Sequence, residues 1–158
     1  MALRKQVVVG SDGLLQQLQA GDTVAGTTDT GQIGGQVAGA ALVAGQVVYT
    51  TANDAINKAQ ANAAGTKDVF GVTTTAVAAA AAGIVQVNGN VVLTTAQWDA
   101  VTGQTGGLTF GGRYFLSPAT AGLLTITPPT AAGQYLCQVG RAISSTEFVV
   151  DPRDPILL

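Results

Sequence analysis

The stretch Ile84-Val85-Gln86-Val87-Asn88-Gly89-Asn90-Val91-Val92-Leu93 is the clearest indication that this chain is built from β-strands. Two runs of β-branched and apolar residues flank Asn88-Gly89. This dipeptide is typical of a two-residue hairpin turn because glycine and asparagine accept a positive φ. The stretch therefore predicts a β-hairpin whose strands cover residues 83–87 and 90–94.

Similar short segments, rich in β-branched residues and separated by Gly, Asn and Pro, lie on both sides of this stretch. Their spacing and composition predict an all-β fold, either a compact β-sandwich or a β-barrel. We expect residues 37–158 to form this β domain, with an extended C-terminal tail and one or two short helical turns. The remaining predicted strands cover residues 41–50, 68–74, 112–117, 123–127, 134–139 and 147–151.

The first 36 residues have a different texture and predict an N-terminal arm or hairpin. The apolar run Val7-Val8-Val9 leads into the turn signal Asp12-Gly13. For the leucine- and glutamine-rich segment 14–19 that follows, a hairpin and a strand followed by a short turn are both tenable. Residues 26–35 are rich in Gly and Thr, which indicates a linker or an extended arm.

Three segments have a composition or capping pattern for which a helix has to be considered. Residues 53–64 have Asn53 or Asp54 as a possible N-cap, and we expect a short helix or a loop with one or two turns. Residues 95–101 predict a helical turn, capped by Thr94 or Thr95, in which Trp98 anchors the turn to the β core. The alanine-rich residues 76–82 lie between β-type flanks, and we favour extended structure there.

The residue inventory argues against an enzyme. The chain has no histidine and a single glutamate, Glu147, so the commonest general base and metal ligand are missing. Glu147 could still pair with an aspartate, but the aspartates mostly lie beside turn-forming residues. The glycine-rich residues 106–112 lack the Gly-Lys-Ser/Thr ending of a phosphate loop. We expect no catalytic residues, no metal site and no cofactor.

The single cysteine and most aromatic residues are expected in the core. Cys137 cannot form an intrachain disulfide, and its neighbours Leu136 and Gln138 indicate a strand. A stacking platform for sugars would instead need several aromatic side chains exposed on one face. The aromatic residues are Tyr49, Phe70, Trp98, Phe110, Tyr114, Phe115, Tyr135 and Phe148.

Composition and charge limit the partners. The formal net charge is −2, and the seven basic residues are scattered along the sequence, which argues against nucleic acid. The longest apolar run, residues 76–84, is too short to span a bilayer, and no signal peptide is visible. Only 10% of the residues are charged, against roughly 25% in an average soluble domain. Either the surface is a neutral β surface, or copies of the chain or a partner cover it; we prefer the second explanation.

Residues 37 to about 151 resemble a module found in capsid decoration proteins and head fibres of tailed bacteriophages. The resemblance lies in turn-and-strand motifs such as Ala44-Gly45-Gln46-Val47-Val48-Tyr49, Phe70-Gly71-Val72 and Gly83-Ile84-Val85-Gln86-Val87-x-Gly89. Further matches to this module are Gly112-x-Tyr114-Phe115-Leu116-Ser117, Gly122-x-Leu124-Thr125, Pro128-Pro129, Gly133, and Gln138-Val139-Gly140-Arg141-Ala142-Ile143-Ser144-x-Thr146. The N-terminal segment resembles the start of phage appendage proteins in the run Val8-Val9-Gly10-Ser11-Asp12-Gly13-Leu14.

The resemblance implies a homotrimeric capsid decoration (cement) protein that is made in the host cytoplasm. Such a protein binds the major capsid protein on the outer surface of the virion and stabilises the head. The alternative is a head- or tail-fibre adhesin that binds a host glycan through residues 103–112; a small hydrolase is nearly excluded. The tail, residues 151–158, either docks on a partner or folds back on its own domain. The predicted contacts are Leu3, Arg4, Lys5, Val7, Leu14, Leu15, Leu18, Ile156, Leu157 and Leu158.

Overall fold

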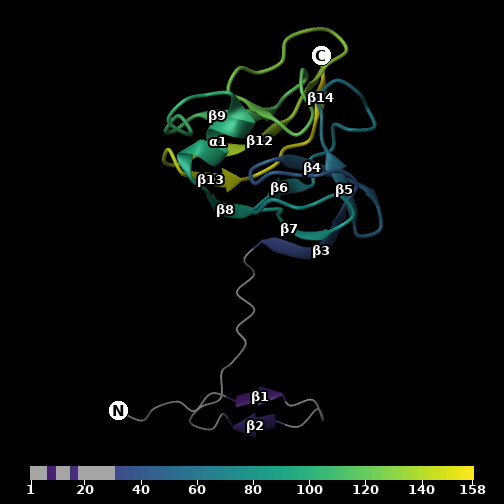
Figure 1. Cartoon of the computed structure of the whole chain (residues 1–158), viewed down its shortest axis with the longest axis vertical. Helices are drawn as coiled ribbons and strands as arrows, with labels where there is room; N and C mark the ends of the chain where they lie inside the picture. The colour runs from purple at the N-terminus through teal and green to yellow at the C-terminus, as the bar shows by residue number, and fades with distance from the viewer. Residues whose placement is uncertain (1–6, 10–14, 18–30) are drawn as a thin grey trace.

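The computed structural model describes residues 7–9, 15–17 and 31–158, and it confirms an all-β fold with one short helix (Figure 1). Residues 31–158 form a closed five-stranded barrel, a five-stranded antiparallel sheet and a two-stranded ribbon. The elements are β1 (Val7–Val9), β2 (Leu15–Gln17), β3 (Gln32–Ala38), β4 (Val47–Ala52), β5 (Ala55–Lys58), β6 (Gly71–Thr73), β7 (Ala82–Gln86), β8 (Gly89–Val92), α1 (Thr95–Thr102), β9 (Arg113–Leu116), β10 (Leu124–Thr125), β11 (Tyr135–Leu136), β12 (Gln138–Ala142), β13 (Glu147–Val150) and β14 (Ile156–Leu157).

The barrel closes in the order β3-β5-β4-β6-β7, with β7 returning to β3. The β3–β5 pairing is parallel and the other four are antiparallel. Closure removes the exposed sheet edges that invite aggregation. The barrel is filled by a small cluster of buried side chains: Ala38, Leu42, Val48, Ile56, Val77 and Val85.

The second sheet has the order β10-β9-β12-β13-β8, and all of its pairings are antiparallel. One face of this sheet shares a single hydrophobic core with the outside of the barrel and with α1. β4 contributes side chains to both hydrophobic clusters: Val48 belongs to the cluster inside the barrel, and Val47 belongs to the core that the barrel shares with the five-stranded sheet. The protein therefore combines the two architectures that the sequence left open.

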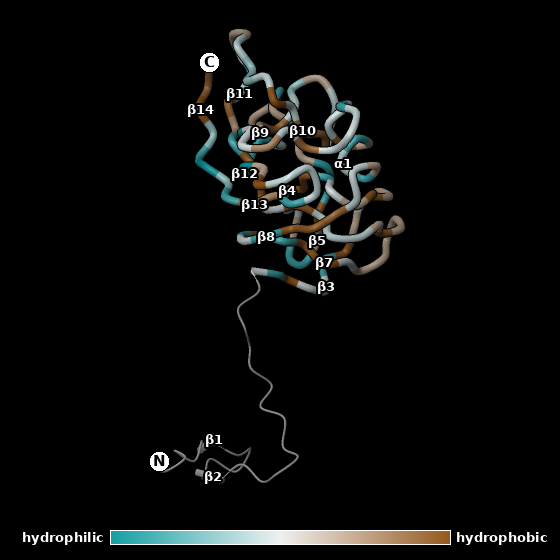
Figure 2. The backbone as a smooth tube through the Cα atoms, turned by 90° about the vertical axis from the view of Figure 1, so that its left-hand side faces the viewer, coloured by the Kyte–Doolittle hydropathy of each residue, from teal (hydrophilic) through white to brown (hydrophobic). Residues whose placement is uncertain are grey.

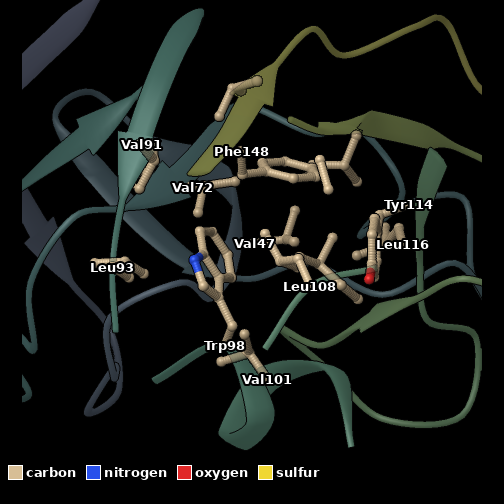
Figure 3. Close-up of a cluster of buried hydrophobic side chains, with 14 of the residues drawn as sticks. Val47, Val72, Val91, Leu93, Trp98, Val101, Leu108, Tyr114, Leu116 and Phe148 are labelled. Atoms are coloured by element: carbon tan, nitrogen blue, oxygen red, sulfur yellow. The ribbon is translucent and has the colours of Figure 1, made fainter. Parts of the chain in front are cut away.

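Three aromatic rings form the centre of the shared core (Figure 3). The rings of Trp98 and Phe148 are inclined to each other by 51°, with centroids 5.5 Å apart, and Tyr114 meets Phe148 edge to face at 5.8 Å. The indole N–H of Trp98 donates to the carbonyl of Thr146 at 2.9 Å. Trp98 thereby satisfies its polar atom inside the core, as a buried tryptophan must.

The helix expected around residues 95–101 is confirmed as α1, and Trp98 anchors it. Thr94 is the N-cap, and Gln97 completes a capping box with it. Gly103 ends the helix in the left-handed conformation, with φ 67°. Among the described residues no helix is long and apolar enough to cross a membrane.

The hairpin predicted at Asn88-Gly89 is wrong, although both of its strands exist. β7 pairs with β3 and β6 inside the barrel, while β8 pairs with β13 in the other sheet. Gly89 does take a positive φ of 85°, so the local turn chemistry was read correctly. The chain uses this turn to pass from the barrel to the five-stranded sheet, so the local turn chemistry does not decide which strands pair.

The helix or loop expected at residues 53–64 is also corrected. Asn53 and Asp54 form the two-residue turn of the β4–β5 hairpin, and Asp54 takes a positive φ of 53°. Asparagine and aspartate tolerate this conformation better than other residues with side chains. The two residues interpreted as a possible helix N-cap therefore form a hairpin turn. Ile56, the one large apolar residue of the segment, is fully buried inside the barrel.

The linker expected at residues 26–35 is corrected over its described part. Residues 32–35 belong to β3, which closes the barrel between β5 and β7. The pairing of β3 with β7 shifts register between Ile33 and Gln36, across Gly34-Gly35, where Gly35 has a φ of 77°. Glycines that indicated flexibility thus form a bulge in a strand. The boundary expected between residues 36 and 37 falls inside β3.

The remaining strand predictions are confirmed with shifted ends, except that the strand expected from residue 41 begins only at Val47, after a turn at Ala44-Gly45. The extended structure favoured for residues 76–82 is only partly present: Val77 makes an isolated bridge to Leu42 and β7 begins at Ala82, but Ala79 and Ala80 form a turn in which Ala80 has a φ of 62°. The strand expected at residues 134–139 is divided into β11 and β12 at Cys137. β1 and β2 pair antiparallel, as the hairpin alternative for the N-terminal segment predicts, while Asp12-Gly13 lies outside the described residues.

Candidate functional site

The C-terminal segment continues the β12–β13 hairpin instead of leaving the domain. The backbone N–H of Asp151 donates to Val139 and that of Arg153 donates to Gln138, both at 3.0 Å. β14 then pairs with β11, and the N–H of Leu158 donates to Gln134. Of the two outcomes left open for the tail, its backbone therefore follows the second and folds back on its own domain.

The side chains at the end of this segment remain in contact with solvent. Ile156 and Leu157 are 59% and 62% exposed, and Leu158 is also exposed. Figure 2 shows this hydrophobic end of the chain running beside β11. Since β11 and β14 form a separate two-stranded ribbon, backbone pairing fixes the segment without covering its aliphatic side chains. The result is an ordered apolar edge, which we call the C-terminal edge (Ile156, Leu157, Leu158).

The other predicted contact residues are in the N-terminal segment. Val7 lies in β1 and Leu15 lies in β2, where Val9 is the residue opposite Leu15. The remaining five lie outside the described residues: Leu3, Arg4, Lys5, Leu14 and Leu18. Among the predicted contacts that the structure describes, Ile156, Leu157 and Leu158 lie together at the C-terminal edge, and Val7 and Leu15 lie on the two paired strands β1 and β2.

A second surface feature was missed in the sequence. The outer face of the five-stranded sheet carries a hollow of about 540 Å³, which we call the arginine hollow. Arg113 of β9 and Arg141 of β12 line it, together with Arg153 from the segment after β13. These are all the arginines among the described residues, and they come from positions 113, 141 and 153 of the chain.

A β-bulge in β12 creates the hollow. β12 shifts its register against β9 between Gln138 and Gly140, so Val139 and Gly140 are both buried while Arg141 is exposed. Strict alternation would have turned Arg141 toward the core. The bulge instead places Arg141 directly opposite Arg113 on the outer face.

Gly140 is required at this bulge. A Cβ atom built on it would lie 2.1 Å from the carbonyl oxygen of Val149 and 2.8 Å from the ring of Phe148. Neither neighbour can withdraw easily, because one is backbone of β13 and the other is a fully buried ring. The glycine before Arg141 was thus the only local signal for the hollow in the sequence.

The electrostatics of the hollow are unbalanced. Arg153 donates to the carboxylate of Asp151 at 2.6 Å, whereas neither Arg113 nor Arg141 forms an ion pair within the described part of the chain. Three arginines and one aspartate leave a formal charge of +2 in a chain whose net charge is −2. Three of the basic residues that are scattered in the sequence therefore line one hollow.

The loop after α1 presents one exposed aromatic ring. Phe110 is 78% exposed, the highest value among the large hydrophobic residues that the structure describes. Hydrogen bonds hold the loop that carries Phe110. The carboxylate of Asp99 accepts from the backbone N–H groups of Gly106 and Gly107 at 3.1 and 2.7 Å. The backbone N–H of Thr109 donates to the hydroxyl of Tyr114 at 2.8 Å. The glycine-rich residues 106–112 are a loop, as predicted.

The remaining candidates for chemistry are dispersed or buried. Cys137 is fully buried, and this burial raises the pKa of its thiol to about 11, despite an opposing effect of the positively charged Lys67. In the described ranges no group of three Cys, Asp or Glu side chains is close enough to hold a metal ion. Of the eight aromatic residues, Trp98, Tyr114 and Phe148 are fully buried, Phe110 is exposed, and Tyr49, Phe70, Phe115 and Tyr135 are half-buried.

Comparison of the chain with protein-family models, with curated proteins and with solved structures gives no match.

Proposed function

We propose that this chain is a non-enzymatic structural protein of a tailed-phage virion, and that it binds the outer surface of the capsid as a decoration protein. The observation that supports this proposal is the C-terminal edge, where two consecutive aliphatic residues of β14 and the leucine that follows them are exposed. Burial of each large aliphatic side chain in a partner contributes roughly 1.5–3 kcal/mol. The sequence motifs that resemble phage decoration proteins point to the major capsid protein as that partner.

The role of such a protein is mechanical. A ligand that binds only the assembled lattice stabilises it by its own binding free energy, through mass action. By contacting neighbouring capsid subunits, the protein opposes their separation under the pressure of packaged DNA. A rigid barrel-and-sheet domain suits this role because the contact surface keeps its shape under load.

We further propose that the protein forms a homotrimer. This part rests on composition, because charged residues make up 10% of the chain and exposed aliphatic residues occur away from the C-terminal edge, such as Val43 and Val92. Light scattering at micromolar concentration is expected to give the mass of three chains. A stable monomer at this concentration contradicts the trimer.

Mixing the purified full-length protein with undecorated capsids tests the decoration role. Stoichiometric, saturable binding is expected, and the double variant Ile156→Ser/Leu157→Ser is expected to bind much more weakly. The matched control is Ile84→Ser/Ile126→Ser, which removes two other exposed aliphatic side chains outside the C-terminal edge, and light scattering checks that both double variants keep the oligomeric state of the wild type. Equal weakening by both double variants, or no binding by the wild type, contradicts the proposal.

The alternative function is a fibre adhesin that binds a host surface glycan, and Phe110 is the observation that favours it. An exposed aromatic ring on a braced loop can stack on the apolar face of a sugar. Only one such ring is displayed in the part of the chain that the structure describes, which weakens this alternative. Saturable binding to host cells that Phe110→Ala abolishes, without any binding to capsids, establishes the adhesin and overturns the decoration role.

A further inference from the structure

The arginine hollow has no role in the contacts proposed above. Arg113 and Arg141 are paired residues on neighbouring antiparallel strands. Like charges directly opposite each other in a sheet destabilise it. A protein that carries only seven basic residues has thus placed two of them where they repel each other. Such an arrangement lowers the stability of the free protein, and an anion bound between the two side chains would remove the repulsion.

The residues that line the hollow suit a ligand that carries an oxyanion next to an apolar group. The guanidinium group presents a planar fork of N–H donors that matches a carboxylate or a phosphate. Beside the arginines, Val149 and the partly exposed Ile143 provide aliphatic surface, and Gln138 provides an amide that can donate to or accept from a peptide group. A volume of about 540 Å³ is large enough for several atoms beyond the anion itself.

Other anions fit this hollow less well. None of the residues that line it is aromatic, so it offers no platform on which a nucleobase or a sugar ring would stack. A net charge of −2 on the chain and three arginines in the hollow give a small footprint for a nucleic acid backbone. A carboxylate side chain next to aliphatic residues satisfies both the charged and the apolar parts of the lining.

We propose that the arginine hollow is a binding site for a glutamate or aspartate carboxylate carried by an acidic, partly aliphatic peptide segment of a protein partner. Arg113 and Arg141 hold the carboxylate from two adjacent strands, and Arg153 remains on its ion pair with Asp151 at the rim. The bulge at Gly140 is the structural device that makes the site, because it turns Arg141 outward. This inference does not depend on the capsid assignment.

The test uses the full-length protein and a capped Leu-Glu-Glu-Leu peptide as the probe. Titration is followed by the Nε–H resonances of the arginines in ¹H–¹⁵N NMR spectra. Saturable shifts of Arg113 and Arg141 are expected, and Arg113→Gln or Arg141→Gln is expected to weaken binding by about tenfold, since each removes a charge-assisted pair of hydrogen bonds. Arg141→Lys keeps the charge but loses the fork, so it is expected to bind with intermediate affinity.

Lys58→Gln is the matched control, because it removes the same charge outside the hollow. Its affinity is expected to stay within about twofold of the wild type, since Lys58 does not line the hollow and salt screens its charge. A capped Leu-Gln-Gln-Leu peptide that binds equally well overturns the proposal, and so does unchanged affinity in both glutamine variants. Parallel titrations with sodium glucuronate, inorganic phosphate and duplex DNA complete the test. Tighter binding of any of these through Arg113 and Arg141 overturns the peptide assignment in favour of that ligand.

Discussion

Arg113 of β9 and Arg141 of β12 face each other as cross-strand partners on the exposed side of the five-stranded sheet. Their juxtaposition depends on a single irregularity, the bulge at which Val139 and Gly140 are buried side by side. An energetically unfavourable pair on an otherwise weakly charged surface is typical of a site whose ligand is absent from the free protein.

The first prediction concerns the stability of the protein without ligand. Arg113→Gln is expected to raise the free energy of unfolding by about 0.5 kcal/mol, because it removes a repulsive cross-strand pair. The gain is expected to shrink when the ionic strength rises from about 0.02 to 0.5 M, since salt screens exposed charges. Urea denaturation measures both effects, because urea is uncharged and leaves the ionic strength at its chosen value. A loss of more than about 1 kcal/mol indicates that Arg113 stabilises the sheet, contrary to our interpretation.

The second prediction concerns the bulge. Gly140→Ala is expected to destabilise the protein by at least about 2 kcal/mol, because the new Cβ overlaps the Val149 carbonyl and the Phe148 ring. Gly65→Ala is the control, since Gly65 has no atom within 4 Å of an added Cβ. Thermal unfolding of the two variants gives the comparison. Equal stability of the variants contradicts the close approach at Gly140.

The third prediction contrasts two aromatic residues. Trp98→Ala is expected to cost about 3–5 kcal/mol, because it empties the centre of the shared core and leaves the Thr146 carbonyl without its indole donor. Phe110→Ala is expected to change stability by less than about 0.5 kcal/mol, because its ring is already in water. Urea unfolding followed by circular dichroism measures both. Similar losses in the two variants contradict the placement of α1 on the core.

The fourth prediction concerns the pH dependence that Cys137 confers. Its pKa is raised from 9.0 to about 11 in the folded protein, so between these values the unfolded thiol ionises while the native thiol stays protonated. Stability contributed by this group is therefore lost as the pH rises through this window, by up to about 1.4 kcal/mol per pH unit.

Cys137→Ala provides the control for this effect. The variant loses a roughly constant amount of packing energy but lacks the thiol, so its stability is expected to fall less steeply above pH 9.0 than that of the wild type. Urea unfolding at several pH values compares the two slopes. Parallel slopes contradict the raised pKa. Native Cys137 is also expected to react slowly with a thiol reagent at neutral pH, because the reagent attacks the thiolate.

The sequence by itself determined the elements that depend on local chemistry. Most strands were predicted within a few residues of their ends, and α1 was predicted with its cap and its tryptophan anchor. Burial of Trp98 and Cys137 followed from apolar neighbours and strand context. These features are local because propensity, capping and turn chemistry act over a few residues.

Only the tertiary structure decided which strands are partners and which side chains meet on the surface. Asn88-Gly89 has the chemistry of a hairpin turn, yet it connects two different sheets, while Asn53-Asp54 turned out to be a hairpin turn that resembled a helix cap. Strand pairing is decided by burial against distant segments, which no local pattern encodes. For the same reason Arg113 and Arg141, separated by 28 positions in the chain, formed a site that only the bulge in β12 and its pairing with β9 brought together.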